Sequence, residues 1–187
     1  MAASHREDNE LIDRFLDGDE QAFNVLVRKH QDFVYNVSRK ITGNHDDAIE
    51  SAQRVFVKLY DRLSSFGKSS AFTTWLYRVA ANESLNLIRS RKLKRWFGLE
   101  DAEKELPSSD DTPFESMLEE EKKEQLDRVL KTLPDRQRAV FVLRMSEGLS
   151  YQEISDILGV STGSLKASFF HAVKKITNAL GKIYEEQ

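Results

Sequence analysis

Gly148-Leu-Ser-Tyr-Gln-Glu-Ile-Ser-Asp-Ile-Leu-Gly159-Val-Ser-Thr-Gly-Ser-Leu-Lys166 is the segment that most strongly constrains the architecture of this chain. Ser150 and Glu153 form the pattern of a capping box, which marks the start of a helix. Gly159 can adopt the left-handed conformation that ends that helix, and Ser161 can cap the next one. Two short helices separated by a glycine turn are the smallest unit that places a helix in the major groove of DNA.

The second of these helices has one apolar side and one cationic side. Leu165, Phe169, Val173 and Ile176 recur at helical spacing, which predicts a buried face. Residues 157–184 contain no acid, whereas Lys166, Lys174, Lys175 and Lys182 are basic. A helix that lies against phosphates has this charge pattern. The alternative is a helical hairpin that only packs, but the caps, the turn and the one-sided charge together favour DNA binding.

Composition excludes several other classes of protein. The chain has 187 residues, 40% of them hydrophobic, 32% charged and none of them cysteine. Disulfides, thiolate metal sites and cysteine nucleophiles are therefore absent. No apolar run approaches the ~20 residues of a membrane span, and the polar N-terminus does not resemble a signal peptide. We expect a cytoplasmic protein that has no membrane insertion, metal, cofactor, small-molecule substrate or catalytic residue.

The net charge of −3 hides a strongly uneven distribution of charge. Residues 84–99 contain no acid, and the five cations there are Arg89, Arg91, Lys92, Lys94 and Arg95. Residues 100–127 are strongly acidic instead. Two basic patches are therefore separated by an acidic stretch, and nucleic acid is the expected partner of the patches.

Helical periodicity predicts an all-α fold of two small domains joined by a flexible acidic linker. Pro107 and Pro113 lie in a stretch of turn formers without periodicity, so we place the linker at residues 97–114. The domains are then residues 1–96 and 115–187. In the first, we expect helices over 23–41, 44–63 and from 72 into the basic patch, with a loop at 64–70. In the second, we expect helices near 116–131 and from Pro134 to Gly148, before the helix-turn-helix pair.

A polar strip on the helix that begins at Phe72 is a candidate for binding bases. Trp75 belongs to the apolar stripe of this helix, and the opposite face carries Arg78, Asn82, Asn86 and Arg89. Asparagine can hydrogen-bond base edges, and arginine can hold phosphates. The preceding loop, residues 66–70, can accept a base drawn out of a duplex. A solvated polar face and an ordinary turn are the alternative interpretations of these two segments.

Two motif blocks resemble the extracytoplasmic-function (ECF, group 4) sigma factors of bacterial RNA polymerase. The block Asp47-Ala48, Gln53, Val55-Phe56 and then Phe72-x-x-Trp75-Leu-Tyr-Arg78-Val-Ala is similar to their second conserved region. The block Leu133-Pro134-x-x-x-Arg138-x-Val-Phe-x-Leu-Arg144, followed by the Gly148–Lys166 stretch, is similar to their fourth. The resemblance covers nearly the whole chain apart from the linker and the two ends.

The resemblance implies that the chain binds core RNA polymerase and directs it to promoter DNA, with an anti-sigma factor as a further partner. The implied contacts with the duplex −35 element are Arg144, Ser161, Thr162, Gly163, Ser164, Lys166, Ala167, Ser168, Phe170, His171 and Lys174. Those with the single-stranded −10 element are Phe66, Lys68, Ser69, Ser70, Arg78, Asn82, Asn86 and Arg89. Those with the polymerase are Asp46, Asp47, Glu50, Gln53, Arg54 and Val57.

Several positions depart from the family pattern, and three of them support one rival hypothesis, a sigma-like decoy. The family usually has arginine at positions 168 and 171 and an acid at position 54, whereas this chain has Ser168, His171 and Arg54. Loss of two cations weakens binding to phosphates. One rival is a sigma-like decoy that binds an anti-sigma factor without initiating transcription. The other rivals are a dimeric helix-turn-helix regulator and, more remotely, an enzyme of nucleic-acid metabolism.

Overall fold

A computed structural model describes residues 2–67, 71–98 and 124–185, and these residues contain helices and turns but no strand. The all-α fold class is thereby confirmed. Most of the predicted linker, the first part of the helix expected near 116–131, and Lys68, Ser69 and Ser70 lie outside the described residues. In the described part of the chain, no helix combines the length and apolarity needed to span a bilayer.

The N-terminal bundle, residues 2–98, consists of α1 (Ala2–Leu16), α2 (Glu20–Thr42), α3 (His45–Arg62), a short 3-10 turn (Leu63–Ser65) and α4 (Phe72–Trp96). Gly43 ends α2 in the left-handed conformation, with φ 76°. The Asn44 side chain then caps α3 by accepting a hydrogen bond from the Asp47 amide. These two adjacent residues form the tight turn between α2 and α3, at the junction of the helices that the sequence predicted over 23–41 and 44–63.

Apolar stripes on α2, α3 and α4 meet in the core of the N-terminal bundle. Its fully buried side chains include Leu26, Val34, Ile41, Val55, Leu59, Leu63, Phe72 and Leu76. Helix α1 is held by a ring cluster, in which Phe15 lies 5.0 Å from Phe23 and 5.3 Å from Tyr60. A buried polar cluster adds to this contact, because the fully buried Asp8 lies 3.0 Å from His30 Nε2 and 2.9 Å from Lys29 Nζ.

The C-terminal unit, residues 124–185, contains a helix over 124–131, α6 (Asp135–Phe141), a π-helical segment (Val142–Ser146), α7 (Tyr151–Leu158) and α8 (Thr162–Glu185). Pro134 stands one residue before α6 rather than at its first helical position. The helix expected to run from there to Gly148 widens into the π-helical segment instead. A small second core joins helix 124–131 to α8 through Leu130, Leu133 and Ile176.

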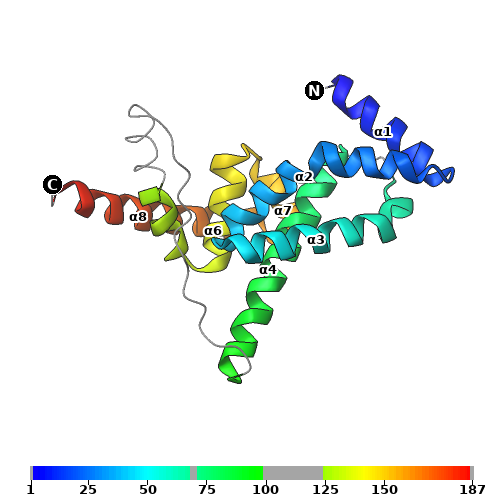
Figure 1. The fold of residues 1–187 in the computed structure, drawn as a ribbon. Helices are drawn as coiled ribbons and strands as arrows, with labels where there is room; N and C mark the ends of the chain where they lie inside the picture. Colours follow the sequence, from blue (N-terminus) through cyan, green and yellow to red (C-terminus); the bar gives the residue numbers. More distant parts are fainter. Residues whose placement is uncertain (1, 68–70, 99–123, 186–187) are drawn as a thin grey trace, which may run out of the picture.

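The two parts pack directly against each other, which the sequence left open. One buried cluster runs from Leu76 and Ala80 of α4 to Val140 of α6, Ile154 of α7 and Leu165 of α8. In Figure 1, α7 lies against α4, while the C-terminal half of α4 and the end of α8 project away from the packed centre. The apolar packing between the two parts therefore forms one continuous core.

Candidate nucleic-acid interface

The α7–α8 pair has the geometry of a helix-turn-helix. The Ser150 hydroxyl accepts from the Glu153 amide at 3.2 Å, and the Glu153 carboxylate accepts from the Ser150 amide at 2.7 Å. Hydrogen bonds from the Ser150 side chain and backbone amide to the Glu153 carboxylate lower the pKa of that carboxyl. Gly159 ends α7 with φ 64°, and the Ser161 hydroxyl accepts from the Ser164 amide at 3.4 Å. Local caps therefore fix where both helices begin and how the chain turns between them.

One face of α8 is open to solvent and carries most of the residues predicted to read the −35 element. The exposed members are Ser161, Gly163, Ser164, Lys166, Ala167, Phe170, His171 and Lys174. Thr162 and Ser168 are half-buried. The Phe170 ring is 64% exposed and lies edge-on to His171, with ring centroids 5.7 Å apart. An exposed aromatic beside cationic and hydroxyl groups suits contacts with both bases and phosphates.

The Arg144 side chain is engaged in contacts within the C-terminal unit and is not fully exposed. Its guanidinium donates to the Leu149 carbonyl at 2.8 Å and lies 5.1 Å from the centre of the Tyr151 ring. These contacts hold the turn that leads into α7. The side chain is half-buried.

Some residues of the polar strip on α4 are exposed, and one makes a hydrogen bond to the C-terminal unit. Arg78, Asn86 and Arg89 are exposed, as the helical spacing predicted. The Asn82 amide instead donates to the Ile157 carbonyl of α7 at 3.2 Å. The side chain in the middle of the strip is therefore held by the C-terminal unit in this conformation.

Phe66 anchors the loop that precedes α4. It is 7% exposed, and its ring lies 5.6 Å from Phe72 and 5.9 Å from Trp75. The loop residues Lys68, Ser69 and Ser70 lie outside the described part of the chain. In the described conformation, the Phe66 ring packs against Phe72 and Trp75 at the start of the loop and is not exposed to solvent.

The predicted polymerase-binding residues lie along α3, where some are exposed and others form ion pairs. Gln53, Arg54 and Val57 are exposed, and so is Asp46. Asp47 and Glu50 are half-buried and pair with Arg91 of α4, at 3.2 Å and 2.9 Å. Arg54 pairs with Glu50 at 2.5 Å, so this departure from the family pattern has a partner one helical turn away.

A mostly apolar groove lies beside these residues, between α2 and α3. It has a volume of about 320 Å³, and its lining includes Tyr35, Ile49, Gln53 and Phe56. Sequence reasoning singled out Gln53 but missed the groove, because it arises from two helices whose separate stripes were assigned to the core. Partly exposed apolar residues such as Ile49, which is 39% exposed, were the available signal.

Sequence reasoning also missed the polar contacts that join the two parts. Glu147 accepts a 2.8 Å hydrogen bond from the Tyr77 hydroxyl and a 2.9 Å bond from Lys40 Nζ. Burial, followed by the hydrogen bond to Glu147, raises the pKa of Tyr77. No local pattern marks these residues, because each contact spans about 70 residues or more of chain. Among the described residues, no group of three metal-ligating side chains is present.

Comparisons with known families support the resemblance of both parts. The family described as Sigma-70 region 2 matches residues 26–94, and the family described as Sigma-70, region 4 matches residues 123–176. Together they account for both motif blocks that the sequence analysis identified.

Curated relatives match along almost the full length. The RNA polymerase sigma-H factor of Pseudomonas aeruginosa is 29% identical over 98% of this chain and 98% of its own. The ECF RNA polymerase sigma-E factor of Escherichia coli K12 is 32% identical over 91% of this chain and 93% of its own. The sigma-E factor of Haemophilus influenzae is 32% identical over 92% and 95%.

Solved structures share the fold at lower sequence identity. CnrH, in complex with the cytosolic domain of CnrY, has a TM-score of 0.65 at 22% identity over 94% of this chain and 98% of that one. RpoE of Bartonella quintana, in complex with the anti-sigma factor NepR, has a TM-score of 0.66 at 19% identity over 85% and 96%. With both conserved regions matched and relatives 32% identical over more than nine-tenths of its length, this chain belongs to the ECF sigma factors of the sigma-70 family.

Proposed function

We propose that this chain binds core RNA polymerase and directs it to promoters, as a transcription initiation factor. In this proposal, residues 1–96 bind the polymerase and the −10 element, residues 97–114 link the domains, and residues 115–187 bind the −35 element. The observation that carries the proposal is the exposed, acid-free face of α8, set on a capped helix-turn-helix.

For the −35 element, α8 enters the major groove with its N-terminus near the DNA backbone. We expect the hydroxyls of Ser161, Thr162 and Ser164 and the amide of Thr162 to donate to phosphate oxygens, as groups at helix N-termini commonly do. Lys166 and Lys174 add charge along the same side. Phe170 is exposed and apolar, which suits contact with a thymine methyl group.

For the −10 element, α4 holds the displaced strand along Arg78, Asn82, Asn86 and Arg89. Each unpaired base costs a few kcal/mol, and contacts with flipped bases offset this cost. Asn82 must leave the Ile157 carbonyl before it can bind a base. The proposed function therefore requires the two parts to separate, at least at the α4–α7 contact.

For the polymerase, the exposed side of α3 and the neighbouring groove form the proposed docking surface. Val57 is 63% exposed, and Gln53 lines the groove. An exposed aliphatic residue beside an apolar groove is a common centre for a protein interface. The paired Asp47 and Glu50 carboxylates form the polar edge of this surface.

Two further parts of the proposal follow from family membership. We infer an anti-sigma factor as a regulatory partner, because the similar CnrH–CnrY and RpoE–NepR structures are complexes and the latter contains an anti-sigma factor. We also infer a cytoplasmic location and no catalytic activity, since sigma factors are initiation factors that act together with the polymerase.

Co-purification with core polymerase, followed by sequencing of the transcripts started in vitro, tests the main proposal. The wild-type chain is expected to bind the polymerase and to start transcripts at defined promoters. Lys166→Ala should lower −35 affinity and reduce the salt slope of binding by about one, because one cation no longer pairs with a phosphate. Arg6→Ala removes an exposed charge from α1 and should change neither quantity.

Three outcomes would count against this proposal. Binding to an anti-sigma factor without promoter-specific transcripts would identify the decoy. Tight operator binding by the free chain as a dimer would identify a conventional helix-turn-helix regulator. No association with the polymerase at all would refute the sigma assignment of function.

A further inference from the structure

The C-terminal end of α4 carries three exposed apolar side chains. Leu93 is 58% exposed, Trp96 86% and Phe97 66%. In Figure 1 this end of the helix projects away from the packed centre. The match to Sigma-70 region 2 ends at residue 94, so Trp96 and Phe97 lie beyond the part of α4 that the family accounts for. An apolar cluster this open on a protein surface commonly marks an interaction site.

These side chains continue the polar strip of α4. Trp96 follows Arg78 by 18 residues, or five turns of about 3.6 residues, so the two lie on one line along the helix. Arg89 and Leu93 lie within roughly 60° of that line. At a rise of ~1.5 Å per residue, Trp96 lies roughly 10 Å beyond Arg89. The face of α4 that begins with Arg78 therefore ends in an exposed aromatic ring.

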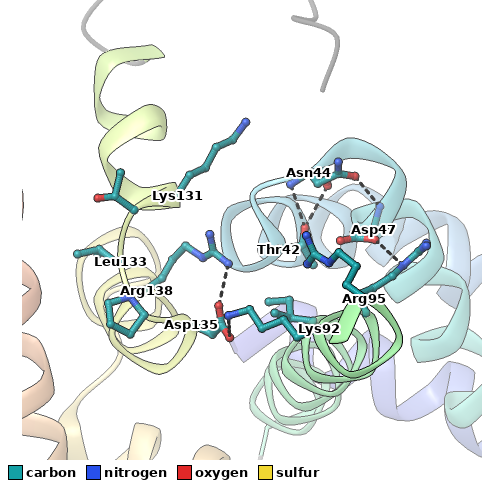
Figure 2. Close-up of a pocket in the computed structure, with 13 residues that line it drawn as sticks. Thr42, Asn44, Asp47, Lys92, Arg95, Lys131, Leu133, Asp135 and Arg138 are labelled. Carbon is teal, nitrogen blue, oxygen red and sulfur yellow. Dashed lines mark hydrogen bonds and ion pairs between the residues drawn. The ribbon is translucent and has the colours of Figure 1, made fainter. Parts of the chain in front are cut away.

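Two cations at this end of α4 are held by ion pairs within the molecule. Figure 2 shows Lys92 of α4 directed toward Asp135 of α6, with which it pairs at 2.6 Å. Arg91 pairs with two carboxylates of α3, at 3.2 Å and 2.9 Å. Helical spacing places Arg91 roughly 140° around the helix from Trp96. The surface around Trp96 therefore does not depend on these two cations.

The chemistry of the exposed face fits an unpaired strand of DNA. Residues 84–99 contain no acid, so the surroundings favour phosphates. Arg89 is exposed and can hold a phosphate, and the exposed Asn86 can hydrogen-bond a base edge. The rings of Trp96 and Phe97 offer surfaces on which bases stack. A duplex keeps its base faces inside the stack, so an unpaired strand is the better fit.

A membrane surface is a poorer fit to the same residues. Helices that lie on a bilayer separate an apolar face from a cationic one. On α4, helical spacing puts Asn86 and Arg89 on the same face as Leu93 and Trp96. Insertion of this face into a bilayer would bury an amide and a guanidinium among apolar chains, which is costly.

We propose that the exposed end of this face binds single-stranded DNA. This surface, called the α4 tip, consists of Asn86, Arg89, Leu93, Trp96 and Phe97. Trp96 stacks on an unpaired base, and Arg89 holds a neighbouring phosphate. Because the tip projects from the packed centre, its binding does not require Asn82 to leave the Ile157 carbonyl.

In promoter opening, the α4 tip adds a second hold on the displaced strand. It extends the strip of contacts by roughly 10 Å past Arg89. The strand can then be captured at the tip while α4 and α7 are still packed together. This role rests on the proposed function, whereas binding of single-stranded DNA by the free chain does not.

Fluorescence of the Trp96 ring tests the stacking contact directly. The chain has two tryptophans, and Trp75→Phe leaves Trp96 as the only one. Phenylalanine keeps a ring beside Phe66 and Phe72, so this variant is expected to fold. A short oligothymidylate should quench the remaining fluorescence at low salt, because its bases stack on the indole. The same strand paired with oligoadenylate should quench it much less, since its bases are already stacked.

Affinity for dye-labelled oligothymidylate, measured by fluorescence anisotropy with the full chain, tests how much the ring contributes. Trp96→Ala should weaken binding by roughly tenfold, the loss expected for one stacked base. Trp96→Phe keeps a ring and should retain most of the affinity. Leu16→Ala is the matched control, since it removes an exposed apolar side chain from the end of α1 and should leave affinity unchanged.

The salt dependence of the same affinity separates stacking from phosphate contact. Arg89→Gln should reduce the salt slope by about 0.7, because one phosphate of the single strand loses its cation. Trp96→Ala should lower affinity at every salt concentration and leave the slope unchanged. A reduced slope in Trp96→Ala would mean that the ring acts only by placing a cation, which contradicts the stacking role.

Four results would overturn the proposal. The first is unchanged Trp96 fluorescence on addition of oligothymidylate, and the second is equal affinity of Trp96→Ala and the wild-type chain. The third is equal quenching by the strand and by its duplex, which would indicate general attraction to phosphates. The fourth is a blue shift of Trp96 emission with vesicles of phosphatidylglycerol and phosphatidylcholine but no response to oligothymidylate, which would identify a lipid surface.

Transcription in vitro with core polymerase separates this proposal from the proposed function. Trp96→Ala should give fewer promoter-specific transcripts from a duplex template, and a template opened beforehand by mismatched bases should narrow the difference. Equal transcripts from the variant and the wild-type chain on both templates would refute the role in promoter opening. Lower affinity of Trp96→Ala for polymerase, with unchanged affinity for oligothymidylate, would show that the tip contacts protein instead.

The two sets of measurements fail independently. Promoter-specific transcripts from the wild-type chain, together with equal oligothymidylate affinities of Trp96→Ala and wild type, would refute the α4 tip and leave the proposed function standing. Oligothymidylate binding that depends on Trp96, with no promoter-specific transcripts, would support the tip and refute the proposed function.

Discussion

The phenolic hydroxyl of Tyr77 donates a 2.8 Å hydrogen bond to the carboxylate of Glu147, 70 residues further along the chain, and so joins α4 to the C-terminal unit. Lys40 of α2 reaches the other oxygen of the same carboxylate at 2.9 Å. The Tyr77–Glu147 contact is partly buried, and Glu147 gathers two donors from two helices of the N-terminal bundle. This carboxylate is therefore a principal polar contact between the two parts.

Removal of the Tyr77 hydroxyl should loosen the contact between the two parts. Tyr77→Phe deletes one hydrogen bond to a charged group, which should cost about 1.5 kcal/mol or more. The chain has no cysteine, so dyes on Asp61→Cys and Asn178→Cys can report the distance between α3 and α8. Energy transfer between the dyes should fall in the variant.

Tyr35→Phe is the control for this experiment. It also deletes a hydroxyl, but the 2.9 Å hydrogen bond that it removes, to His45, lies within the N-terminal bundle. Its energy transfer should match that of the unsubstituted chain. If both variants behaved alike, the Tyr77–Glu147 bond would not be what holds the two parts together.

Substitution by alanine should destabilise the protein more at Gly43, which ends α2, than at Gly159, which ends α7. Gly43 and Gly159 both have positive φ, so alanine costs about 1 kcal/mol of backbone strain at either position. A Cβ at Gly43 would also lie 3.1 Å from both Arg138 and Lys131, whereas a Cβ at Gly159 would meet open space. Gly43→Ala should therefore lower the free energy of unfolding more than Gly159→Ala, as measured by urea denaturation. Equal losses would mean that the close approach of Arg138 is unimportant.

Loss of the buried Asp8 carboxylate should lower the free energy of unfolding far more than loss of the exposed Glu7 carboxylate. Asp8 is fully buried against His30 and Lys29, so Asp8→Ala should cost about 3 kcal/mol. Glu7 also pairs with Lys29, at 2.6 Å, but its side chain is 65% exposed. Glu7→Ala should cost less than about 1 kcal/mol. Urea denaturation of both variants measures the difference, and a small effect of Asp8→Ala would show that its buried ion pairs contribute little to stability.

The capping box of α7 should make stability depend on acid pH. Hydrogen bonds from Ser150 lower the pKa of Glu153. The contribution of Glu153 to the free energy of unfolding is therefore fully present above the ordinary glutamate pKa of about 4.5. That contribution is lost as the pH falls through the lowered pKa. Ser150→Ala should cost about 1 kcal/mol at neutral pH and reduce this acid sensitivity.

Ser155→Ala provides the matched control for the capping box. Ser155 lies inside the same helix, where alanine is a better helix former, so stability should not fall. Thermal unfolding at pH 7 and below pH 4.5 compares the two variants. An unchanged acid dependence in Ser150→Ala would remove the capping box as its cause.

Much of the fold could be predicted because its signals are local. Gly43 and Asn44 stand next to each other and specify one turn, and Ser150, Glu153 and Gly159 specify the limits of α7. Each signal acts within a few residues of chain, which is the range that helical periodicity and capping rules describe. The open side of α8 followed from the same periodicity. The π-helical segment at Val142–Ser146 did not, because its ordinary apolar residues continue a helical pattern without interruption.

The packing between the two parts could not be predicted from local patterns. Asn82 was correctly placed on the polar face of α4, but its partner is a backbone carbonyl 75 residues away. Glu147 lies in an ordinary helix-terminating sequence, and its structural role comes from its hydrogen bonds with Tyr77 and Lys40. Such contacts depend on how finished helices meet in space, and a single sequence does not record that choice. The residues predicted to contact DNA and polymerase remain predictions that the experiments above can test.

If Asn82 binds the −10 strand as proposed, its hydrogen bond to the Ile157 carbonyl links promoter choice to the resting state of the molecule. In the proposed function, the same amide group either holds α4 against α7 or binds the opened strand, and it cannot do both at once. A substitution at position 82 that alters which bases are preferred would also alter how often the unbound chain stands open. Changes in sequence preference at this position would then be accompanied by changes in background activity, and selection would act on both together.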